Sequence, residues 1–356
     1  MLRFGSRSSL LLPLALAACS GSAPSATGRS NEPHVRLAPQ AGPQVATQAG
    51  GRQAPERQAP EQRAGEPEPL AQAAPACPAD MALIDGDYCE TLEVDCQKSW
   101  HAPQNHLYVC EEVAQPTRCL KMGNRKRYCI DQFEFPNRRG VRPMVMQNFY
   151  QAQLHCAARS KRVCTESEWT MACEGPSRTP FPYGYRRDPT KCRGDQRWDF
   201  PSKQKLLDRD PVELERLWQG VPSGSQPDCV SEAGVHDLPG NADELAASEG
   251  TGPADFDNVT TGGPWYLGVR NMCRPKIRSH DESFAYYYLS WRCCQEPDGA
   301  ATEPRSPRQL ARGESWDKVV WRAHHSWKLP FNPKVPGDAG YEAAGTDRVR
   351  PEAETP

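Results

Sequence analysis

Hydrophobic and polar residues alternate in two short stretches of this chain, and each alternation is typical of a β-strand. The first, residues 81–88, alternates weakly and carries a turn signal at Asp85-Gly86. The second, residues 128–135, alternates more clearly, with Tyr128 and Ile130 on one side and Phe135 on the other. Because successive side chains of a strand point to opposite faces, we predict a strand in each stretch.

Two helices are predicted after the second strand. Apolar residues recur at helical spacing from 148 to 159. A second helix begins after Thr165, which forms a capping box with Glu168, and it ends at Gly175-Pro176. The residues of this helix that are expected to face the core are Trp169, Ala172 and Cys173.

Composition divides the rest of the chain into a globular domain and polar flanks. Residues 77–297 are assigned to the domain, and within it 89–127 is interpreted as a disulfide-pinned, Cys-rich insertion. Residues 298–356 are mostly polar and are predicted to be a mostly disordered tail. One amphipathic stretch, 314–327, predicts a short helix in this tail. The helix is expected to dock on its own domain, with partner binding as the alternative.

The N-terminus, residues 1–19, has the form of a bacterial lipoprotein signal peptide. Arg3 and Arg7 accompany an apolar run that is too short to cross a bilayer as a helix. Leu16-Ala17-Ala18-Cys19 has the form of a lipobox, which implies cleavage before Cys19 and lipidation of its thiol. A plain secretory signal with a chance cysteine is the alternative. Ser20 in place of an Asp favours the outer membrane, where several acyl chains would anchor the protein stably.

Residues 20–76 are predicted to be a disordered tether. They are rich in Ala, Pro, Gln, Gly and Ser, and a five-residue unit at 52–56 is repeated at 57–61. Such a composition cannot bury enough apolar surface to offset the entropy of ordering. The tether would hold the domain away from the lipid surface.

The cysteine count indicates an oxidising compartment. The chain has 15 cysteines, so fourteen remain if Cys19 is lipidated. It contains no Cys-x-x-Cys pair, which argues against a zinc ribbon or a thioredoxin-like redox site. Up to seven disulfides are therefore expected, in the periplasm or outside the cell. The formal net charge is -2 with both signs interspersed, which argues against a nucleic-acid partner.

Five motifs occur in order along the globular domain. They are Arg162-Val163-Cys164-Thr165-Glu166-Ser167-Glu168-Trp169, Phe181-Pro182-Tyr183-Gly184, Gly234 to Glu244, Gly262-Gly263-Pro264-Trp265 and Ser290-Trp291-Arg292-Cys293. Together they resemble the formylglycine-generating enzyme (sulfatase-modifying factor) family over roughly residues 78–295. The resemblance implies an irregular, disulfide-rich α+β fold that is distantly like C-type lectins and has little regular secondary structure.

The resemblance also locates the family's reaction. Its oxidases hold Cu(I) between two thiolates, since soft sulfur ligands suit that ion. Those cysteines lie four and nine residues after the second glycine of the Gly-Gly step. Counted from Gly263, the two positions are Leu267 and Met272, and neither is a cysteine. Copper is therefore not expected, and the domain is interpreted as a pseudoenzyme.

Cys273 lies one residue beyond the second of these positions. An alignment through Ile277-Arg278-Ser279 implies instead that Cys273 is a structural cysteine and pairs with Cys173. By the same logic, Cys156 would pair with Cys293 or Cys294. The alternative is a one-residue shift, which would make Cys273 the reactive thiol of an oxidase or another metal-dependent enzyme.

Two further sites are implied by the resemblance. A calcium loop of the family corresponds here to Ser231, Glu232, Gly234 and His236, where Glu232 offers a hard oxygen ligand; a loop held by disulfides without metal is the alternative. The family's peptide groove would be lined by Trp265, Tyr266, Arg270, Arg274 and Lys276, since aromatic residues beside Arg anchor binding surfaces well. Core packing is the alternative for Trp265.

These patterns favour a lipid-anchored protein of the bacterial cell envelope, on the periplasmic or the surface face. Its domain is predicted to bind a peptide, a glycan or another envelope protein. A catalytic role through Cys273 is the alternative, and a purely structural envelope protein is a third interpretation.

Overall fold

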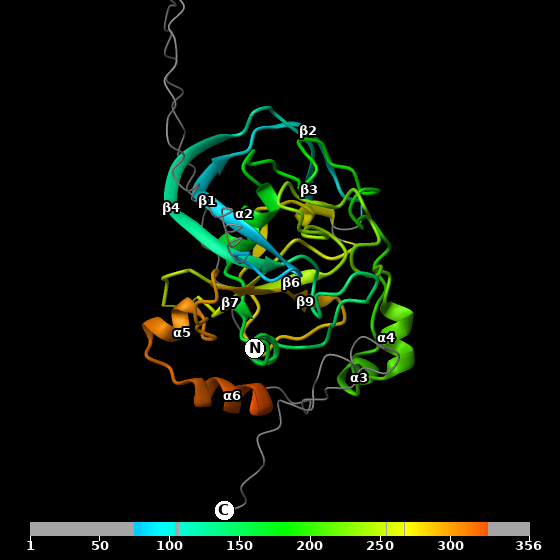
Figure 1. Ribbon diagram of the computed structural model, residues 1–356. Helices are drawn as coiled ribbons and strands as arrows, with labels where there is room; N and C mark the ends of the chain where they lie inside the picture. Colours follow the sequence, from blue (N-terminus) through cyan, green and yellow to red (C-terminus); the bar gives the residue numbers. More distant parts are fainter. Residues whose placement is uncertain (1–74, 104–106, 254, 267, 327–356) are drawn as a thin grey trace, which may run out of the picture. The chain divides into compact units, whose positions relative to one another are not determined.

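The computed structural model describes residues 75–103, 107–253, 255–266 and 268–326. The predicted signal peptide with Cys19, nearly all of the tether, Leu267 and the chain from residue 327 onward lie outside the described residues. The described part has a mixed α+β architecture with short helices, short strands and long loops, as expected for an irregular fold (Figure 1).

Within the described residues, the strands form two four-stranded sheets and one separate hairpin. In spatial order, the first sheet contains β1 (Met81–Glu93), β4 (Arg118–Asp131), β10 (Cys293–Gln295) and β5 (Arg162–Val163). The second contains β8 (Lys276–Ile277), β7 (Asn258–Thr261), β6 (Asp243–Ala247) and β9 (Leu289–Trp291). The hairpin consists of β2 (Cys96–His101) and β3 (Tyr108–Val113). Only β6 and β9 pair in parallel.

The helices of the described residues are α1 (Phe149–Ala157), α2 (Glu166–Glu174), α3 (Lys203–Leu207), α4 (Pro211–Leu217), α5 (Pro307–Ala311), α6 (Trp316–His325) and the 3-10 turn η1 (Gly268–Arg270). The first two lie where the sequence predicts them. In the part of the chain that the structure describes, no helix has the length and apolar character needed to cross a membrane.

The predicted capping box of α2 is present. The Thr165 N–H donates to the Glu168 carboxylate at 2.8 Å, and the Glu168 N–H donates to the Thr165 hydroxyl at 3.4 Å. The same carboxylate accepts two 2.7 Å hydrogen bonds from the Arg162 guanidinium. Local capping therefore determines where α2 begins, and the ion pair ties that turn to β5.

The two strands have other bounds than the alternating stretches 81–88 and 128–135 that predict them. Strand β4 begins at Arg118 and ends at Asp131, before Phe133 and Phe135. Phe135 leaves the sheet because its N–H donates to the Trp291 carbonyl at 2.7 Å and its ring stacks on Trp291 with centroids 4.4 Å apart. Much of the first half of β4 is exposed on both faces, so it carries no alternating pattern.

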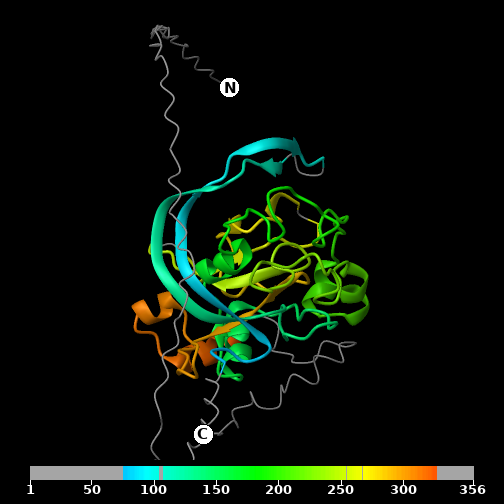
Figure 2. The ribbon, with the colours of Figure 1, turned by 45° about the horizontal axis from the view of Figure 1, so that its top comes forward.

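The predicted insertion 89–127 is a curved arm. Figure 2 shows the outer halves of β1 and β4 curving around the rest of the domain and carrying the β2–β3 hairpin at their tip. Two disulfides hold the arm, Cys89–Cys119 at its middle and Cys96–Cys110 in the hairpin. These covalent links stabilise a segment that has little core of its own.

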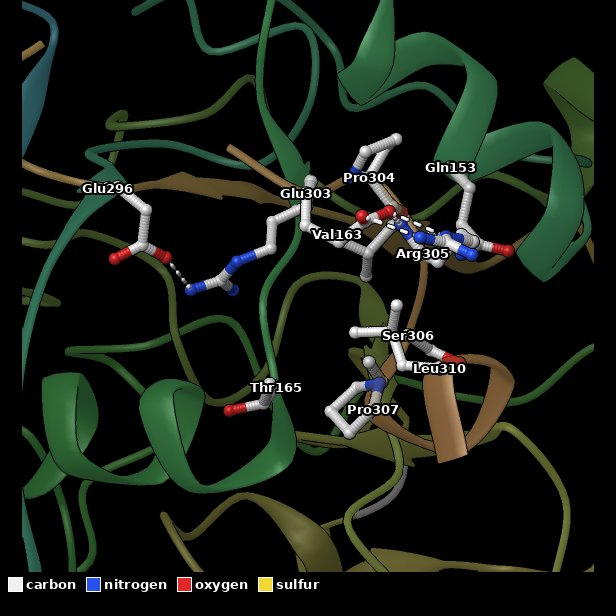
Figure 3. A pocket seen from close by; sticks show the side chains of 12 residues that line it. Gln153, Val163, Thr165, Glu296, Glu303, Pro304, Arg305, Ser306, Pro307 and Leu310 are labelled. Carbon is white, nitrogen blue, oxygen red and sulfur yellow. Dashed lines mark hydrogen bonds and ion pairs between the residues drawn. The ribbon is translucent and has the colours of Figure 1, made fainter. Parts of the chain in front are cut away.

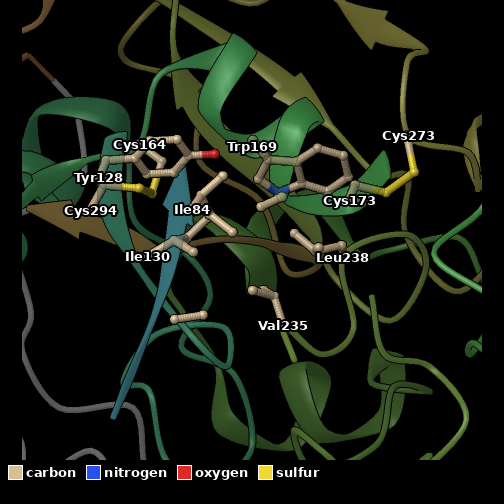
Figure 4. Packing of buried hydrophobic residues seen from close by; sticks show 12 residues of the cluster. Ile84, Tyr128, Ile130, Cys164, Trp169, Cys173, Val235, Leu238, Cys273 and Cys294 are labelled. Carbon is tan, nitrogen blue, oxygen red and sulfur yellow. A yellow bond between two sulfur atoms is a disulfide. The ribbon is translucent and has the colours of Figure 1, made fainter. Parts of the chain in front are cut away.

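The core behind the arm is built around Trp169 of α2 (Figure 4). The Trp169 ring is fully buried, and its indole N–H donates to the Glu244 carboxylate at 3.0 Å. Glu244 also accepts hydrogen bonds of 2.6 and 2.8 Å from Arg292, and both of these charged side chains are 0% exposed. The pair joins α2, β6 and the segment after β9.

Seven disulfides use all fourteen cysteines of the described residues. Besides the two in the arm, they are Cys77–Cys129, Cys156–Cys293, Cys164–Cys294, Cys173–Cys273 and Cys192–Cys229. Cys156 is joined to Cys293 and not to Cys294, because Cys294 is bonded to Cys164.

The segment after Pro297 packs on the domain over much of its described length. Helix α6 lies within the stretch 314–327 that predicts it, and its Val319 and Ala323 pack against Tyr150 and Leu154 of α1. Before it, the Gln309 side chain of α5 exchanges hydrogen bonds of 2.8 and 3.0 Å with Gln153 of α1.

Candidate functional site

The loop between β7 and β8, residues 262–275, is the candidate site. It opens with Gly262 and Gly263, whose φ angles are 87° and 70°. A Cβ on Gly262 would lie 2.4 Å from the Leu238 carbonyl oxygen, so this position has no room for a side chain. The double glycine therefore lets the loop approach the backbone of the 238–241 segment closely.

A buried ion pair holds the centre of this loop. Arg270 and Asp243 are both nearly inaccessible, and the Arg270 guanidinium donates to the Asp243 carboxylate. Burial raises the pKa of Asp243, and the charge of Arg270 opposes that shift. The Asn271 side chain adds hydrogen bonds of 3.2 Å to the carbonyls of both Gly262 and Gly263. The loop is therefore held from inside.

Cys273 is covalently bonded to Cys173 of α2, with an S–S distance of 2.04 Å, as the yellow bond in Figure 4 shows. Both residues are buried, at 0% and 1% exposure. The Cys273 N–H also donates to the Pro180 carbonyl at 3.0 Å. The disulfide therefore fixes the end of the loop to the C-terminal half of α2.

The tip of the arm lies against the same loop. The Arg187 guanidinium carbon lies 5.8 Å from the centroid of the Trp100 ring of β2, and the guanidinium pairs with Asp195. A Cβ on Gly268 of η1 would lie 2.6 Å from the Arg187 guanidinium, so the two are in direct contact. Backbone hydrogen bonds join the arm to this region as well, from Val113 N–H to the Tyr185 carbonyl at 3.0 Å and from Arg187 N–H to the Glu111 carbonyl at 2.8 Å.

Residues 123–338 match the sulfatase-modifying factor enzyme 1-like domain. The chain belongs to this family. Among solved structures, this family member is similar to CarF, with 11% sequence identity and a TM-score of 0.40 over 62% of this chain and 98% of CarF. It is also similar to PvdO from Pseudomonas aeruginosa, with 15% identity and a TM-score of 0.40 over 63% of this chain and 99% of PvdO. No curated protein matches the chain.

The copper chemistry that the sulfatase-modifying factor family implies does not fit the residues present. By the count from Gly263, Met272 stands at one of the two expected thiolate positions and Leu267, outside the described residues, at the other. The nearby sulfur of Cys273 is bonded to Cys173, so it is not a thiolate. Because Cu(I) is held by soft, ionised sulfur ligands, this loop offers it no suitable pair.

The five predicted groove residues do not line one open groove. Trp265 is 1% exposed and packs edge-on against Trp218, and Arg270 is buried in its ion pair with Asp243. Tyr266 is half-buried, and burial raises the pKa of its phenol. The other two are Arg274 and Lys276, which lie on the α2 side of the loop.

Arg274 and Lys276 are engaged with α2 and the arm. Arg274 pairs with Glu174 and donates to the Cys89 carbonyl at 2.8 Å. The Lys276 ammonium donates to the Thr170 hydroxyl at 2.8 Å, and burial lowers its pKa to about 8. Both cations therefore help to position the loop through contacts within the protein.

The side chains of three predicted calcium ligands contact other parts of the protein. The Ser231 hydroxyl accepts from the Val235 N–H at 3.4 Å, and Glu232 accepts from the Ser177 N–H at 3.3 Å. His236 stacks on Phe133 with ring centroids 5.0 Å apart. Across 75–103, 107–253, 255–266 and 268–326, no group of three or more His, Cys, Asp or Glu side chains is placed to hold a metal ion. The calcium site at this loop stays a prediction.

A cavity of about 240 Å³ lies where the segment 303–310 meets β5 and the start of α2 (Figure 3). Its charged side chains are paired with one another: Arg162 donates to Glu296 at 3.1 Å and Arg305 to Glu303 at 2.8 Å. The pairing with Arg305 lowers the pKa of Glu303. This pairing is typical of a contact between two packed segments and not of an acid-base site.

Sequence reasoning did not identify a buried carboxylate pair beneath the 238–241 segment. Glu134 accepts from the Ser223 hydroxyl at 2.5 Å and from the Asn241 amide at 2.8 Å, while Asp237 accepts from the Gly224 N–H at 2.6 Å. Burial raises the pKa of both carboxyls, that of Asp237 to about 6. The two carboxylates and their partners Ser223, Gly224 and Asn241 come from three separated stretches of the chain, so no local motif signals the pair.

Proposed function

We propose that this member of the sulfatase-modifying factor family is a lipid-anchored protein of the bacterial envelope that binds a partner and does not oxidise cysteine. The partner would be a peptide, a glycan or another envelope protein. The anchor would be Cys19, in the lipobox Leu16-Ala17-Ala18-Cys19. The seven disulfides support an oxidising compartment such as the periplasm or the cell exterior.

The observation that carries the proposal is the Cys173–Cys273 disulfide. A one-residue shift of register would have left Cys273 as the single candidate for a reactive thiol, and its sulfur is consumed in a buried bond. A disulfide sulfur is neither a nucleophilic thiolate nor a good copper ligand. Arg187, which lies over Trp100 of the arm tip, also contacts Gly268 and so covers part of the loop in which the family places its chemistry.

A thiol count with a copper titration tests the proposal. The full chain carrying Cys19→Ser would be unfolded without reductant and treated with a maleimide, and we expect no cysteine to react. The same chain with Cys173→Ala added is the positive control, because it releases one thiol at Cys273. Native protein should also fail to remove Cu(I) from a chromogenic chelator.

The opposite result would support an enzyme. One reactive thiol mapped to Cys273 in the native chain, together with stoichiometric Cu(I) uptake, would overturn the proposal and favour an oxidase. Uptake that Cys273→Ser leaves unchanged would point to copper bound elsewhere and would leave the proposal standing.

A further inference from the structure

A series of aromatic rings, each in contact with the next, lies beside the candidate site. Phe200 is 79% exposed, and each of the other rings is partly exposed. Neighbouring centroids are 3.9 to 6.2 Å apart. In order of contact, this aromatic row consists of Phe200, Trp198, Tyr266, Tyr288, Tyr286, Phe284 and His280. Contiguous apolar groups at a protein surface mark places where a ligand or another segment binds.

The middle of the row is held in place by the core beneath it. Phe284, Tyr286 and Tyr288 are partly exposed, whereas Ala285 and Tyr287 between them are buried. The inner sides of the three partly exposed rings pack on the buried residues of the domain. The rings are therefore positioned before anything binds, which lowers the entropy cost of binding.

The spacing of the row suits a polyproline II segment. Such a segment has three residues per turn, so prolines three positions apart lie along one side and about 9 Å from each other. Two steps along the row are similar in length, since the Tyr288 centroid lies 4.8 Å from that of Tyr286 and 5.3 Å from that of Tyr266. Surfaces lined by aromatic rings bind proline-rich segments because the polyproline II helix is already formed and loses little entropy.

The sequence carries prolines at this spacing shortly after α6. Pro330, Pro333 and Pro336 are three positions apart, and no other three prolines of the sequence follow one another in this way. All three lie outside the described residues. The match to the sulfatase-modifying factor family ends at residue 338 and so includes them.

Helix α6 ends close to one end of the row. The Ser326 hydroxyl accepts from the Asn148 amide at 3.4 Å. The next residue, Phe149, donates its N–H to the Glu282 carbonyl at 3.1 Å, and Glu282 is two residues before Phe284. The segment after Ser326 therefore starts beside the row. In polyproline II form, residues 327–336 would span about 31 Å, enough to pass along several rings.

We infer that the segment 329–336 of this same chain binds the aromatic row, with its three prolines against the tyrosine rings. The row is thus a proline-binding surface whose first occupant is part of the protein itself. A short connection to Ser326 gives the segment an effective concentration of about millimolar, which favours it over a second copy of the chain. The inference goes beyond the proposed function and does not rest on it.

Photocrosslinking in the full chain carrying Cys19→Ser tests the contact. Phe331, between two of the prolines, is replaced by photoreactive benzoylphenylalanine, and the crosslinked peptides are mapped by mass spectrometry. We expect crosslinks within one chain to residues 284–288 or to Tyr266. The same group in place of Tyr341, beyond the spaced prolines, is the control and should not label the row.

A proline variant tests whether the row is occupied. We expect the triple substitution Pro330→Ala, Pro333→Ala and Pro336→Ala to leave the row vacant. A synthetic peptide of residues 328–337 should then bind this variant about tenfold or more tightly than the unaltered chain, because affinity falls with the vacant fraction.

A matched variant removes three prolines from the predicted tether and should leave the affinity for the peptide within about twofold of that of the unaltered chain. Its substitutions are Pro39→Ala, Pro43→Ala and Pro55→Ala. The inference fails if crosslinks from position 331 fall away from the row, or if the peptide binds the triple variant and the unaltered chain alike or binds neither. Crosslinks that join two chains would assign the row to a second copy and overturn the contact within one chain. In each case an unreactive Cys273 would leave the proposed function standing.

Discussion

At the scale of single residues, the Arg292–Glu244 pair organises the interior. Arg292 also donates to the carbonyls of Asp131 and His236, at 3.2 and 3.0 Å, so one guanidinium contacts three separate segments. Burial lowers and the Glu244 charge raises the pKa of Arg292, and the net direction is upward. Buried charges are tolerated when they are paired and fully hydrogen-bonded, and this pair meets that condition.

Removing one partner of this pair should be costly. Glu244→Ala leaves the Arg292 charge buried without a counter-ion and the Trp169 indole N–H without its acceptor, so we expect a loss of about 3–5 kcal/mol in the free energy of unfolding. Urea denaturation monitored by tryptophan fluorescence would measure it. The control is Glu303→Ala, which breaks a half-exposed pair with Arg305 and should cost less than about 1 kcal/mol. Equal losses in the two variants would contradict this account of the interior.

At the scale of elements, the arm is a strand pair with little core of its own between its base and its tip. Its base continues the first sheet, and its tip contacts the 185–187 segment and η1. Between them both faces are largely exposed, so the arm depends on its two disulfides more than the sheets do. Such elements open locally without global unfolding.

The double variant Cys96→Ser with Cys110→Ser should open the tip. The bond closes a loop of 14 residues, and constraining a loop of that size contributes about 3 kcal/mol. Hydrogen exchange across β2 and β3 should speed up markedly, while the amides of β6 keep their protection. Unchanged exchange at the tip would show that its contacts with the 185–187 segment suffice to hold it.

At the scale of the whole molecule, the domain extends past the composition boundary at Pro297. Helices α5 and α6 return to α1, and Arg312 pairs with the buried Asp257, with hydrogen bonds of 2.6 and 2.7 Å. The sequence of this segment is polar because it contributes only a narrow apolar stripe. That stripe predicts one helix, α6, and the contacts of α5 are made mainly by polar side chains.

A chain that ends at Pro297 should therefore be less stable than one that ends at Ser326. The truncation exposes Tyr150 and Leu154, and full burial of one side chain of this size contributes about 1.5–3 kcal/mol, so we expect a loss of several kcal/mol and a lower melting temperature. Calorimetry on both chains would measure it. Equal melting temperatures would mean that the two helices add nothing to the domain.

Much of the local structure could be predicted from the sequence. The α2 capping box involves residues three positions apart, and the absence of a cysteine at position 272 is visible in the letters themselves. The Cys173–Cys273 bond was implied by a family resemblance, because its two cysteines are 100 residues apart and no local pattern connects them. The arm strands escaped prediction since exposure on both faces removes the alternation on which strand prediction depends.

By itself, the sequence determined where helices are capped, which positions lack a thiol, and that the cysteines are numerous enough to cross-link the domain. These properties depend on residue identity and on neighbours within one or two turns. Only the tertiary structure decided that Trp265 and Arg270 are buried, that Arg187 links the arm tip to Gly268, and that β1 is the terminal strand of its sheet. Those features arise from contacts between residues far apart in the chain, and packing alone selects them.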